Sequence, residues 1–256
     1  MRSIDLNCDM GESFGSWRLG CDEAIMPHIT SANIACGAHA GDPNVMAHTV
    51  RLAKAHGVVI GAHPGYPDLQ GFGRRPLRMS SEEVVSMLLY QLGALWGIAR
   101  QFGVELHHVK PHGALYNSAA VDRKLASAIA QAAYAFSPSI ILYCLPGSEM
   151  EIAGAHMGLS MACEGFVDRA YEPSGLLVDR REAGAVYDDA QKAANQGVQL
   201  ANGQVTCRDG STLSLQIDTL CIHGDTPQAI EFAQATNESL RRSGFLVEAI
   251  SNGRQQ

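Results

Sequence analysis

The sequence predicts an α/β protein in which helices cover a mostly parallel sheet. Seven short β-prone runs alternate along the chain with segments of helical periodicity, and this alternation is typical of parallel sheets with helices on their faces. The chain has 256 residues, of which 46% are hydrophobic, and barrels of alternating strands and helices use roughly 250 residues as one unit. Seven units are compatible with a closed barrel or with a doubly wound open sheet. We expect a single domain over residues 1–256.

Each predicted strand is a short run of apolar and β-branched residues with polar or glycine residues at its ends. The runs cover residues 3–8, 31–36, 58–62, 106–109, 140–145, 159–163 and 220–222. Two further β-like runs flank the turn residues at 208–211, Arg-Asp-Gly-Ser. We therefore expect a β-hairpin insertion near residues 204–216, which would make a barrel irregular.

Two of the predicted helices carry sequence signals at their ends. Asp42-Pro43 is typical of an N-cap followed by proline at the first helical position, and Gly57 ends that helix. Ser80 and Glu83 have the spacing of a capping box, which opens a long helix that ends near Gly103.

Two later helices are predicted from periodicity and from their termini. Thr226-Pro227 opens the last helix, and Arg241 and Arg242 precede its end at Gly244, where they suit the negative end of the helix dipole. The other helix shows one apolar face, formed by Val121, Leu125, Ala128, Ile129, Ala132, Ala133 and Phe136.

Charge and composition argue against several classes of protein. The chain carries 26 acidic and 19 basic residues, a formal net charge of -7, so we expect no binding to nucleic acid and none to an anionic membrane. The first residues lack the apolar run of a signal peptide, and no run of about 18 apolar residues occurs elsewhere. Seven cysteines without a C-x-x-C pair favour neither a disulfide framework nor a structural zinc site. We expect a cytoplasmic protein that acts on a small molecule or on another protein.

Polar and ionisable residues directly follow almost every predicted strand. In a barrel of parallel strands these positions lie on one rim, where such folds build active sites. Histidine can move protons or bind a metal near neutral pH, and a lysine at a strand end suits stabilisation of a developing negative charge. In strand order the residues are Asn7, Asp9 and Glu12, then His39, His63, Lys110 and His112, then Glu164, Asp168 and Arg169, and finally His223 and Asp225.

Some of these residues also have a purely structural interpretation. Asp9 and Glu12 would act as N-caps of the next helix. Asp168 and Arg169 would form an ion pair on the surface.

The loop at residues 64–79 is long for a connection between a strand and a helix. It would act either as a lid that presents Arg74 to a carboxylate or phosphate, or as a solvated surface loop. The sequence has no Walker A loop and no complete dinucleotide fingerprint. A nucleotide would therefore need a different kind of binding site.

Three groupings of these residues suggest chemistry. Asp9, His39 and His63 could hold a divalent metal with positions left open for water. Cys36 and His39 could act as a nucleophile and its base. We favour a third grouping, general acid–base hydrolysis of an amide by a carboxylate and histidines, with Lys110 as the electrostatic stabiliser.

Five stretches of the sequence resemble the LamB/YcsF family. They are DLNCDMGESFG at 5–15, NIACGAHAGDP at 33–43, GAHPGYPDLQGFGRR at 61–75, VKPHGALYN at 109–117 and CIHGDTP at 221–227. The match covers essentially the whole chain in the order of the family. The resemblance implies an irregular seven-unit (β/α) barrel of the glycoside hydrolase/deacetylase type, which agrees with the strand count.

The resemblance also implies an activity: the A subunit of a 5-oxoprolinase, which with B and C subunits opens 5-oxoproline (pyroglutamate) to L-glutamate. ATP is the co-substrate and is cleaved to ADP and phosphate. Phosphorylation of the amide oxygen would make a poor electrophile reactive toward water activated by Asp9 or a rim histidine. We expect Asp9, His63, Lys110, His112 and His223 to be catalytic, and Asn7, Glu12, His39, Arg74, Arg169 and Asp225 to bind substrate or phosphate.

Two other functions stay open from the sequence. The chain could be a metal-dependent deacetylase or amidohydrolase that acts alone, with Asp9, His39 and His63 as the ligands of a divalent metal. It could also be a non-catalytic subunit that binds the lactam while partner subunits do the chemistry.

Overall fold

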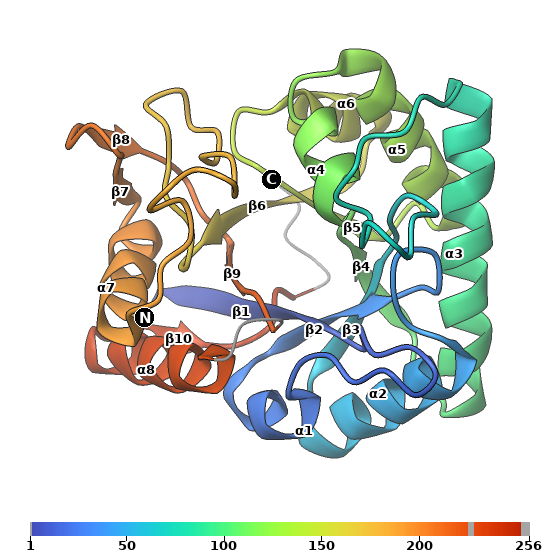
Figure 1. Cartoon of the computed structure of the whole chain (residues 1–256), viewed down its shortest axis with the longest axis horizontal. Helices are drawn as coiled ribbons and strands as arrows, with labels where there is room; N and C mark the ends of the chain where they lie inside the picture. The colour runs from blue at the N-terminus through green and yellow to red at the C-terminus, as the bar shows by residue number, and fades with distance from the viewer. Residues whose placement is uncertain (1, 225–227, 252–256) are drawn as a thin grey trace.

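The computed structural model describes residues 2–224 and 228–251, and seven of its strands form a closed parallel barrel (Figure 1). The barrel closes because β1 pairs in parallel with both β2 and β9, which excludes the open-sheet alternative. The bounds lie within a few residues of the predicted runs. The barrel strands are β1 (Ser3–Met10), β2 (Ser31–Ala35), β3 (Val59–His63), β4 (Leu106–Val109), β5 (Ile141–Cys144), β6 (Ser160–Phe166) and β9 (Thr219–Ile222).

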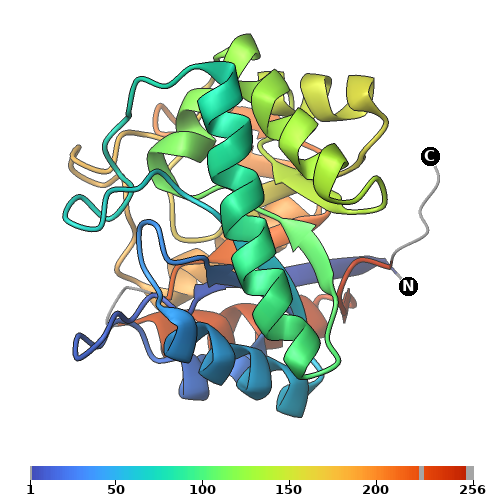
Figure 2. The same cartoon turned by 90° about the vertical axis from the view of Figure 1, so that its right-hand side faces the viewer.

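Helices surround the barrel, and α3 runs along its outside (Figure 2). Helix α7 packs against α8, and α5 packs against both α3 and α6. None of the described helices is long and apolar enough to cross a membrane. The helices are α1 (Asp22–Ile25), the 3-10 helix η1 (Met26–His28), α2 (Pro43–His56), α3 (Ser81–Gln101), α4 (Gly113–Ala119), α5 (Arg123–Phe136), α6 (Glu149–Met157), α7 (Ala190–Ala201) and α8 (Ala229–Arg242).

The predicted helix ends at α2 and α3 are confirmed. The Asp42 carboxylate accepts hydrogen bonds from the backbone N–H groups of Asn44 and Val45, and Gly57 ends α2 at a φ of 69°. Ser80 and Glu83 form the reciprocal capping box at the start of α3.

The structure corrects the predicted start of the third helix. Val121 lies before α5 and is 64% exposed, so it does not belong to the apolar face. The reason is the Asp122 side chain, which accepts from the N–H groups of Lys124 and Leu125 and therefore begins the helix at Arg123. The predicted start of the last helix, Thr226-Pro227, lies outside the described residues.

Two short strands form the hairpin that precedes the last barrel strand. β7 (Gln204–Thr206) pairs antiparallel with β8 (Thr212–Ser214). The turn residues at 208–211 lie between them, as the sequence predicts. A third short strand, β10 (Leu246–Val247), pairs with β1 at Ser3 and Ile4.

The interior of the barrel is polar, whereas the main apolar core lies between the barrel and its helices. Along β1 the apolar residues Ile4, Leu6, Cys8 and Met10 belong to that core. The alternate residues Asp5, Asn7 and Asp9 are also buried, and they bond to side chains from other strands. Because successive side chains of a strand point to opposite faces, one strand supplies both the core and the polar interior.

Candidate active site

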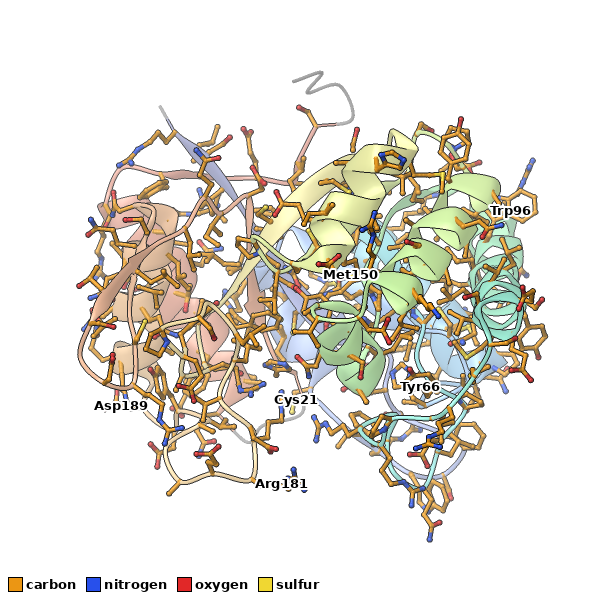
Figure 3. All side chains as sticks on the ribbon, turned by 90° about the horizontal axis from the view of Figure 1, so that it is seen from above. Cys21, Tyr66, Trp96, Met150, Arg181 and Asp189 are labelled. Atoms are coloured by element: carbon orange, nitrogen blue, oxygen red, sulfur yellow. The ribbon has the colours of Figure 1, made fainter. Side chains whose placement is uncertain are left out.

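A pocket of about 690 Å³ opens at the carboxyl ends of the barrel strands. Loops after β3 and β6 extend its wall, and Figure 3 shows Tyr66 and Arg181 from these two loops on the same side of the molecule. Of the predicted site residues, those that line the pocket are Asp9, Glu12, His63, Arg74, Lys110, His112, Arg169 and His223. Asn7 and His39 are buried and are not among the lining residues, and Asp225 lies outside the described residues.

Lys110 is the centre of a buried polar network at the base of the pocket. Its Nζ lies 2.9 Å from Asp9 Oδ1 and 2.8 Å from Glu164 Oε1, and it also donates to Asn7 Oδ1 and Cys221 Sγ. Burial alone would lower the pKa of Lys110, but Asp9, Cys221 and Glu164 outweigh it and raise this pKa well above the usual value. Lys110 is therefore a permanently charged ammonium group held between two carboxylates.

Asp9 belongs to the same network and does not cap a helix. Its Oδ2 lies 3.3 Å from His63 Nε2, and its Oδ1 accepts a hydrogen bond from Asn33 Nδ2. Burial would raise the pKa of Asp9, but His63 and Lys110 hold it well below the usual value. The carboxylate is therefore a weak proton acceptor, which argues against Asp9 as the general base.

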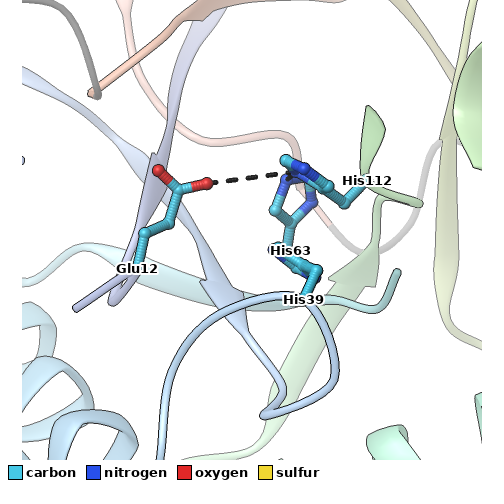
Figure 4. A group of neighbouring side chains, drawn as sticks. All are labelled: Glu12, His39, His63 and His112. Carbon is cyan, nitrogen blue, oxygen red and sulfur yellow. Dashed lines mark hydrogen bonds and ion pairs between the residues drawn. The ribbon is translucent and has the colours of Figure 1, made fainter. Parts of the chain in front are cut away.

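Four ionisable side chains gather at one wall of the pocket (Figure 4). They are Glu12, His39, His63 and His112, whose potential ligand atoms all lie within 4.8 Å of one another. His63 Nε2 is 3.0 Å from His112 Nδ1, and the His39 ring stacks on the His112 ring with centroids 3.8 Å apart. Burial lowers the pKa of both His39 and His112, so both rings favour the neutral form.

This cluster differs from the metal-ligand set predicted from the sequence. His39 and His63 lie together as expected, but Asp9 belongs to a separate group with Cys221 and His223. Glu12 and His112 take its place beside the two histidines. Three imidazoles and a carboxylate fit the ligand preferences of a divalent transition metal.

His223 and Asp168 form a dyad in the pocket. His223 Nδ1 lies 2.8 Å from Asp168 Oδ2, and the Asp168 side chain is fully buried. Burial lowers the pKa of His223 against the opposing effect of Asp168. The neutral ring therefore carries its proton on Nδ1 and its lone pair on Nε2, which is the arrangement of a general base oriented by a carboxylate.

The structure contradicts the interpretation of Asp168 and Arg169 as a surface ion pair. Both side chains are buried, and Asp168 pairs with His223 instead. Arg169 donates to the backbone carbonyls of Val178 and Ala185, and burial lowers its pKa to about 10. These bonds fix the loop after β6.

The loop after β3 contributes to the pocket as expected. Arg74 and Arg75 line it, Arg75 pairs with Asp68, and the Arg74 guanidinium lies 4.8 Å from the centre of the Phe72 ring. These contacts give the loop defined internal structure, so it is more than a solvated surface segment.

The proposed pairing of Cys36 with His39 receives no support from the geometry. The Cys36 thiol donates to the backbone carbonyl of Ile34, and burial raises its pKa to about 12. The thiolate needed for nucleophilic attack is therefore disfavoured at neutral pH.

Sequence reasoning missed three residues of the site. Asn33 links Asp9 to Asn7, and Arg180 lines the pocket. The Tyr116 hydroxyl also faces this region, where burial and Glu164 raise its pKa well above the usual value. The available signal for Asn33 was its position at the centre of a buried strand, because an amide there requires hydrogen-bonding partners in the barrel.

Comparisons with known proteins agree with the geometry of the site. The model of the LamB/YcsF family matches residues 4–255. A Natranaerobius thermophilus protein, named as the A subunit of 5-oxoprolinase, is 51% identical over 251 residues, which are 98% of each chain. The crystal structure of a lactam utilization protein from Thermus thermophilus superposes with a TM-score of 0.92 and 46% identity, covering 97% of this chain and 100% of that one.

More distant structures identify the type of barrel. A family 4 carbohydrate esterase from Streptomyces lividans superposes with a TM-score of 0.50 at 12% identity, covering 98% of this chain and 94% of that one. This likeness concerns the fold alone. It confirms the prediction of a deacetylase-type barrel.

Proposed function

The chain belongs to the LamB/YcsF family, and on this premise we propose that it is the A subunit of an ATP-dependent 5-oxoprolinase. The substrate class follows from relatives that carry the name of this 5-oxoprolinase chain and match over almost the whole sequence. The observation that supports hydrolysis is the His223–Asp168 dyad in the wall of the pocket.

The proposed reaction consumes one ATP and two waters for each lactam opened. The amide oxygen of 5-oxoproline attacks the γ-phosphorus of ATP and releases ADP. Water then adds to the activated ring carbon, and the C–N bond breaks as the nitrogen takes up a proton. The resulting acyl phosphate reacts with the second water to give L-glutamate and phosphate. Activation by ATP is needed because an unstrained lactam is a poor electrophile.

Within this reaction His223 is the general base. Its Nε2 would take a proton from the attacking water while Asp168 stabilises the imidazolium that forms. Lys110 is held by Asp9 and Glu164, so we assign it the task of fixing these two carboxylates. The arginines at the mouth of the pocket, Arg74 and Arg180, suit the substrate carboxylate and the transferred phosphate.

We further propose that the protein works in the cytoplasm with B and C subunits. All seven cysteines are free, which is typical of a reducing compartment. The relatives are named as one subunit of an enzyme, which indicates an assembly of more than one chain.

The experiment measures glutamate and ADP formed from 5-oxoproline and ATP. It compares this chain alone, the partner subunits alone and the mixture. We expect turnover only in the mixture, with ADP and glutamate in equal amounts. An inert mixture, or glutamate formation independent of ATP, would contradict the proposal.

The histidine cluster favours a second candidate, a metal-dependent deacetylase that acts alone. Three histidines and Glu12 resemble the ligands of metal-assisted hydrolysis. Cleavage of a simple acetamide by the metal-loaded chain, without partners, would favour this candidate. A third possibility is a subunit that only binds the lactam, in which case His223→Gln would weaken binding and turnover to the same extent.

A further inference from the structure

The ring nitrogens of His63 and His112 have an unusual relation. His63 Nδ1 lies 2.7 Å from the backbone oxygen of Lys110, and His112 Nε2 lies 2.8 Å from the backbone oxygen of Phe72. A carbonyl oxygen can only accept a hydrogen bond, so these two nitrogens carry the protons. In the neutral rings the other nitrogens, His63 Nε2 and His112 Nδ1, then present lone pairs to each other at 3.0 Å.

Two lone pairs at hydrogen-bond distance repel each other unless something positive lies between them or beside them. The choices are a proton shared by the two rings or a bound cation. In metal sites, carbonyl oxygens often hold the outer nitrogens of the histidine ligands, because this sets the tautomer and aims the other nitrogen at the ion. Both rings have this arrangement.

His39 adds an independent observation at the same place. Its side chain is buried, with 1% of the residue exposed, and neither ring nitrogen has a hydrogen-bond partner. A buried polar group without a partner is costly. A metal ion beside His63 and His112 would supply the partner, since a His39 ligand atom lies within 4.8 Å of theirs.

Glu12 supplies the negative charge that a divalent cation requires. Its Oε1 lies 4.0 Å from His112 Nδ1, and its side chain is only 5% exposed. Ligand atoms around a tetrahedral Zn²⁺ with bonds of about 2.0–2.1 Å lie roughly 3.3 Å apart. The group would therefore contract on binding, with a rotation of the His39 ring, which now lies parallel to His112.

The glycines of the loop after β3 leave room for these rings. A Cβ atom at Gly65 would lie 2.6 Å from His39 Nδ1, and one at Gly73 would lie 2.8 Å from His39 Cβ and 2.9 Å from His112 Cδ2. The backbone of this loop therefore packs directly against the cluster. This gives the loop a task beyond that of a lid, because it forms one wall around the histidines.

We propose that Glu12, His39, His63 and His112 bind one divalent transition-metal ion of the Zn²⁺ class. Three imidazoles and one carboxylate are ligands of this class of ion, whereas Mg²⁺ and Ca²⁺ prefer oxygen ligands. When bound, such an ion would act as a Lewis acid at the wall of the pocket. The site does not depend on the lactam or on the proposed role of His223.

The test measures metal binding directly. The full-length chain is stripped with a chelator and titrated with Co²⁺, whose visible absorption reports nitrogen ligands in a tetrahedral field, and the bound Zn²⁺ is measured by mass spectrometry after dialysis. We expect one equivalent of metal per chain. His63→Asn and His112→Gln should each weaken binding at least tenfold.

A matched control separates this cluster from its neighbour. His223 belongs to the group with Asp9 and Cys221, so His223→Gln should bind metal as the wild-type chain does. Circular dichroism of each variant checks that it is folded. Loss of metal in His223→Gln but not in His63→Asn or His112→Gln would overturn the assignment.

The shared-proton alternative has its own signature. If the wild-type chain binds no metal, and nitrogen NMR finds both ring nitrogens of His63 protonated at neutral pH, the proposal is wrong. Because neither readout uses 5-oxoproline or ATP, a failure here is distinct from a failure of the 5-oxoprolinase proposal.

Discussion

At the residue scale, Asp168 determines which nitrogen of His223 can act as a base. The carboxylate accepts from Nδ1 with both of its oxygens, at 3.0 and 2.8 Å. It is fully buried, so water cannot replace it as the partner. The proton of the neutral ring is therefore fixed on the side away from Nε2.

We expect Asp168→Asn to lower kcat for lactam opening by about 10²- to 10⁴-fold. The amide of asparagine can turn its NH₂ group toward His223, which favours the wrong tautomer. Steady-state glutamate formation with the partner subunits measures the effect. The control is Asp209→Asn, in the exposed hairpin turn, which should retain the wild-type rate; a kcat within threefold of wild type for Asp168→Asn would contradict this role.

Lys110 matters for stability because it neutralises two buried carboxylates. We expect Lys110→Met to destabilise the fold by about 3–5 kcal/mol, since Asp9 and Glu164 would be left without a buried cation. Urea unfolding measures the change. Addition of Glu164→Gln should recover part of the loss, and Lys124→Met, at an exposed position, should shift stability by less than about 0.5 kcal/mol. Near-wild-type stability of Lys110→Met would show that the network is dispensable.

The sequence could predict which residues reach the pocket but not how they pair. His63, Lys110, His112 and His223 each follow a strand, and the parallel barrel brings their positions to one rim. Asp168 pairs with His223 rather than with its neighbour Arg169, because the relative rotation and stagger of the strands set the pairing. That information is not local in the sequence.

At the scale of the elements, capping residues gave the most accurate predictions. Asp42 and Ser80 act within three residues of their own positions, so the local sequence contains the whole interaction. Val121 was misplaced because its spacing fits the helical period even though Asp122 starts the helix after it. A cap therefore outweighs periodicity at a helix end.

We expect Asp42→Ala to destabilise the protein by about 1–2 kcal/mol. The substitution removes the acceptor for the N–H groups of Asn44 and Val45 and also the acceptor for Gly15 N–H, which Oδ2 bonds at 2.7 Å. Thermal and urea unfolding measure the loss. Asp188→Ala is the control, because this exposed aspartate precedes the cap of α7 and is not itself the cap; equal effects of the two substitutions would argue against capping as the cause.

At the scale of the whole molecule, the closed barrel holds ionisable groups away from water. His108 lies inside it, donates from Nε2 to Asn33 Oδ1 at 2.7 Å and stacks on Tyr143. Burial, with smaller effects of His107 and Lys110, lowers the pKa of His108 well below its usual value. The folded protein therefore keeps this ring neutral at a pH where the unfolded chain would protonate it.

The sign of the resulting pH dependence follows from proton linkage. Below about pH 6.5 the unfolded chain binds a proton that folded His108 does not, so stability falls as the pH decreases, by about 1.4 kcal/mol for each unit of pKa lowering. His108→Phe can still stack on Tyr143 but cannot titrate. We expect this variant to be less stable than wild type at about pH 7.5 but to lose less stability on going to about pH 5.5. Urea unfolding at both pH values checks this, and an unchanged loss would rule out His108 as a source.

The seven-unit count could be read from the sequence, whereas closure of the barrel could not. Alternation of strands and helices is a local pattern, and it fits both an open sheet and a barrel. Closure depends on the pairing of β1 with β9, which are separated by almost the whole chain. The polar interior gives the sequence its one hint, because Asp5, Asn7 and Asp9 alternate within a strand that is otherwise apolar.

The pairing of β1 with β9 also has a consequence for synthesis of the protein. Leu6 pairs with Leu220, so at about 5–20 residues per second the ribosome makes β9 roughly ten to forty seconds after β1. During that time β1 has an open edge, and an open edge can pair with other nascent chains. Charged residues on an unpaired strand oppose such aggregation. Asp5 and Asp9, which later hold the interior of the barrel together, would thus first keep the new chain apart from its neighbours.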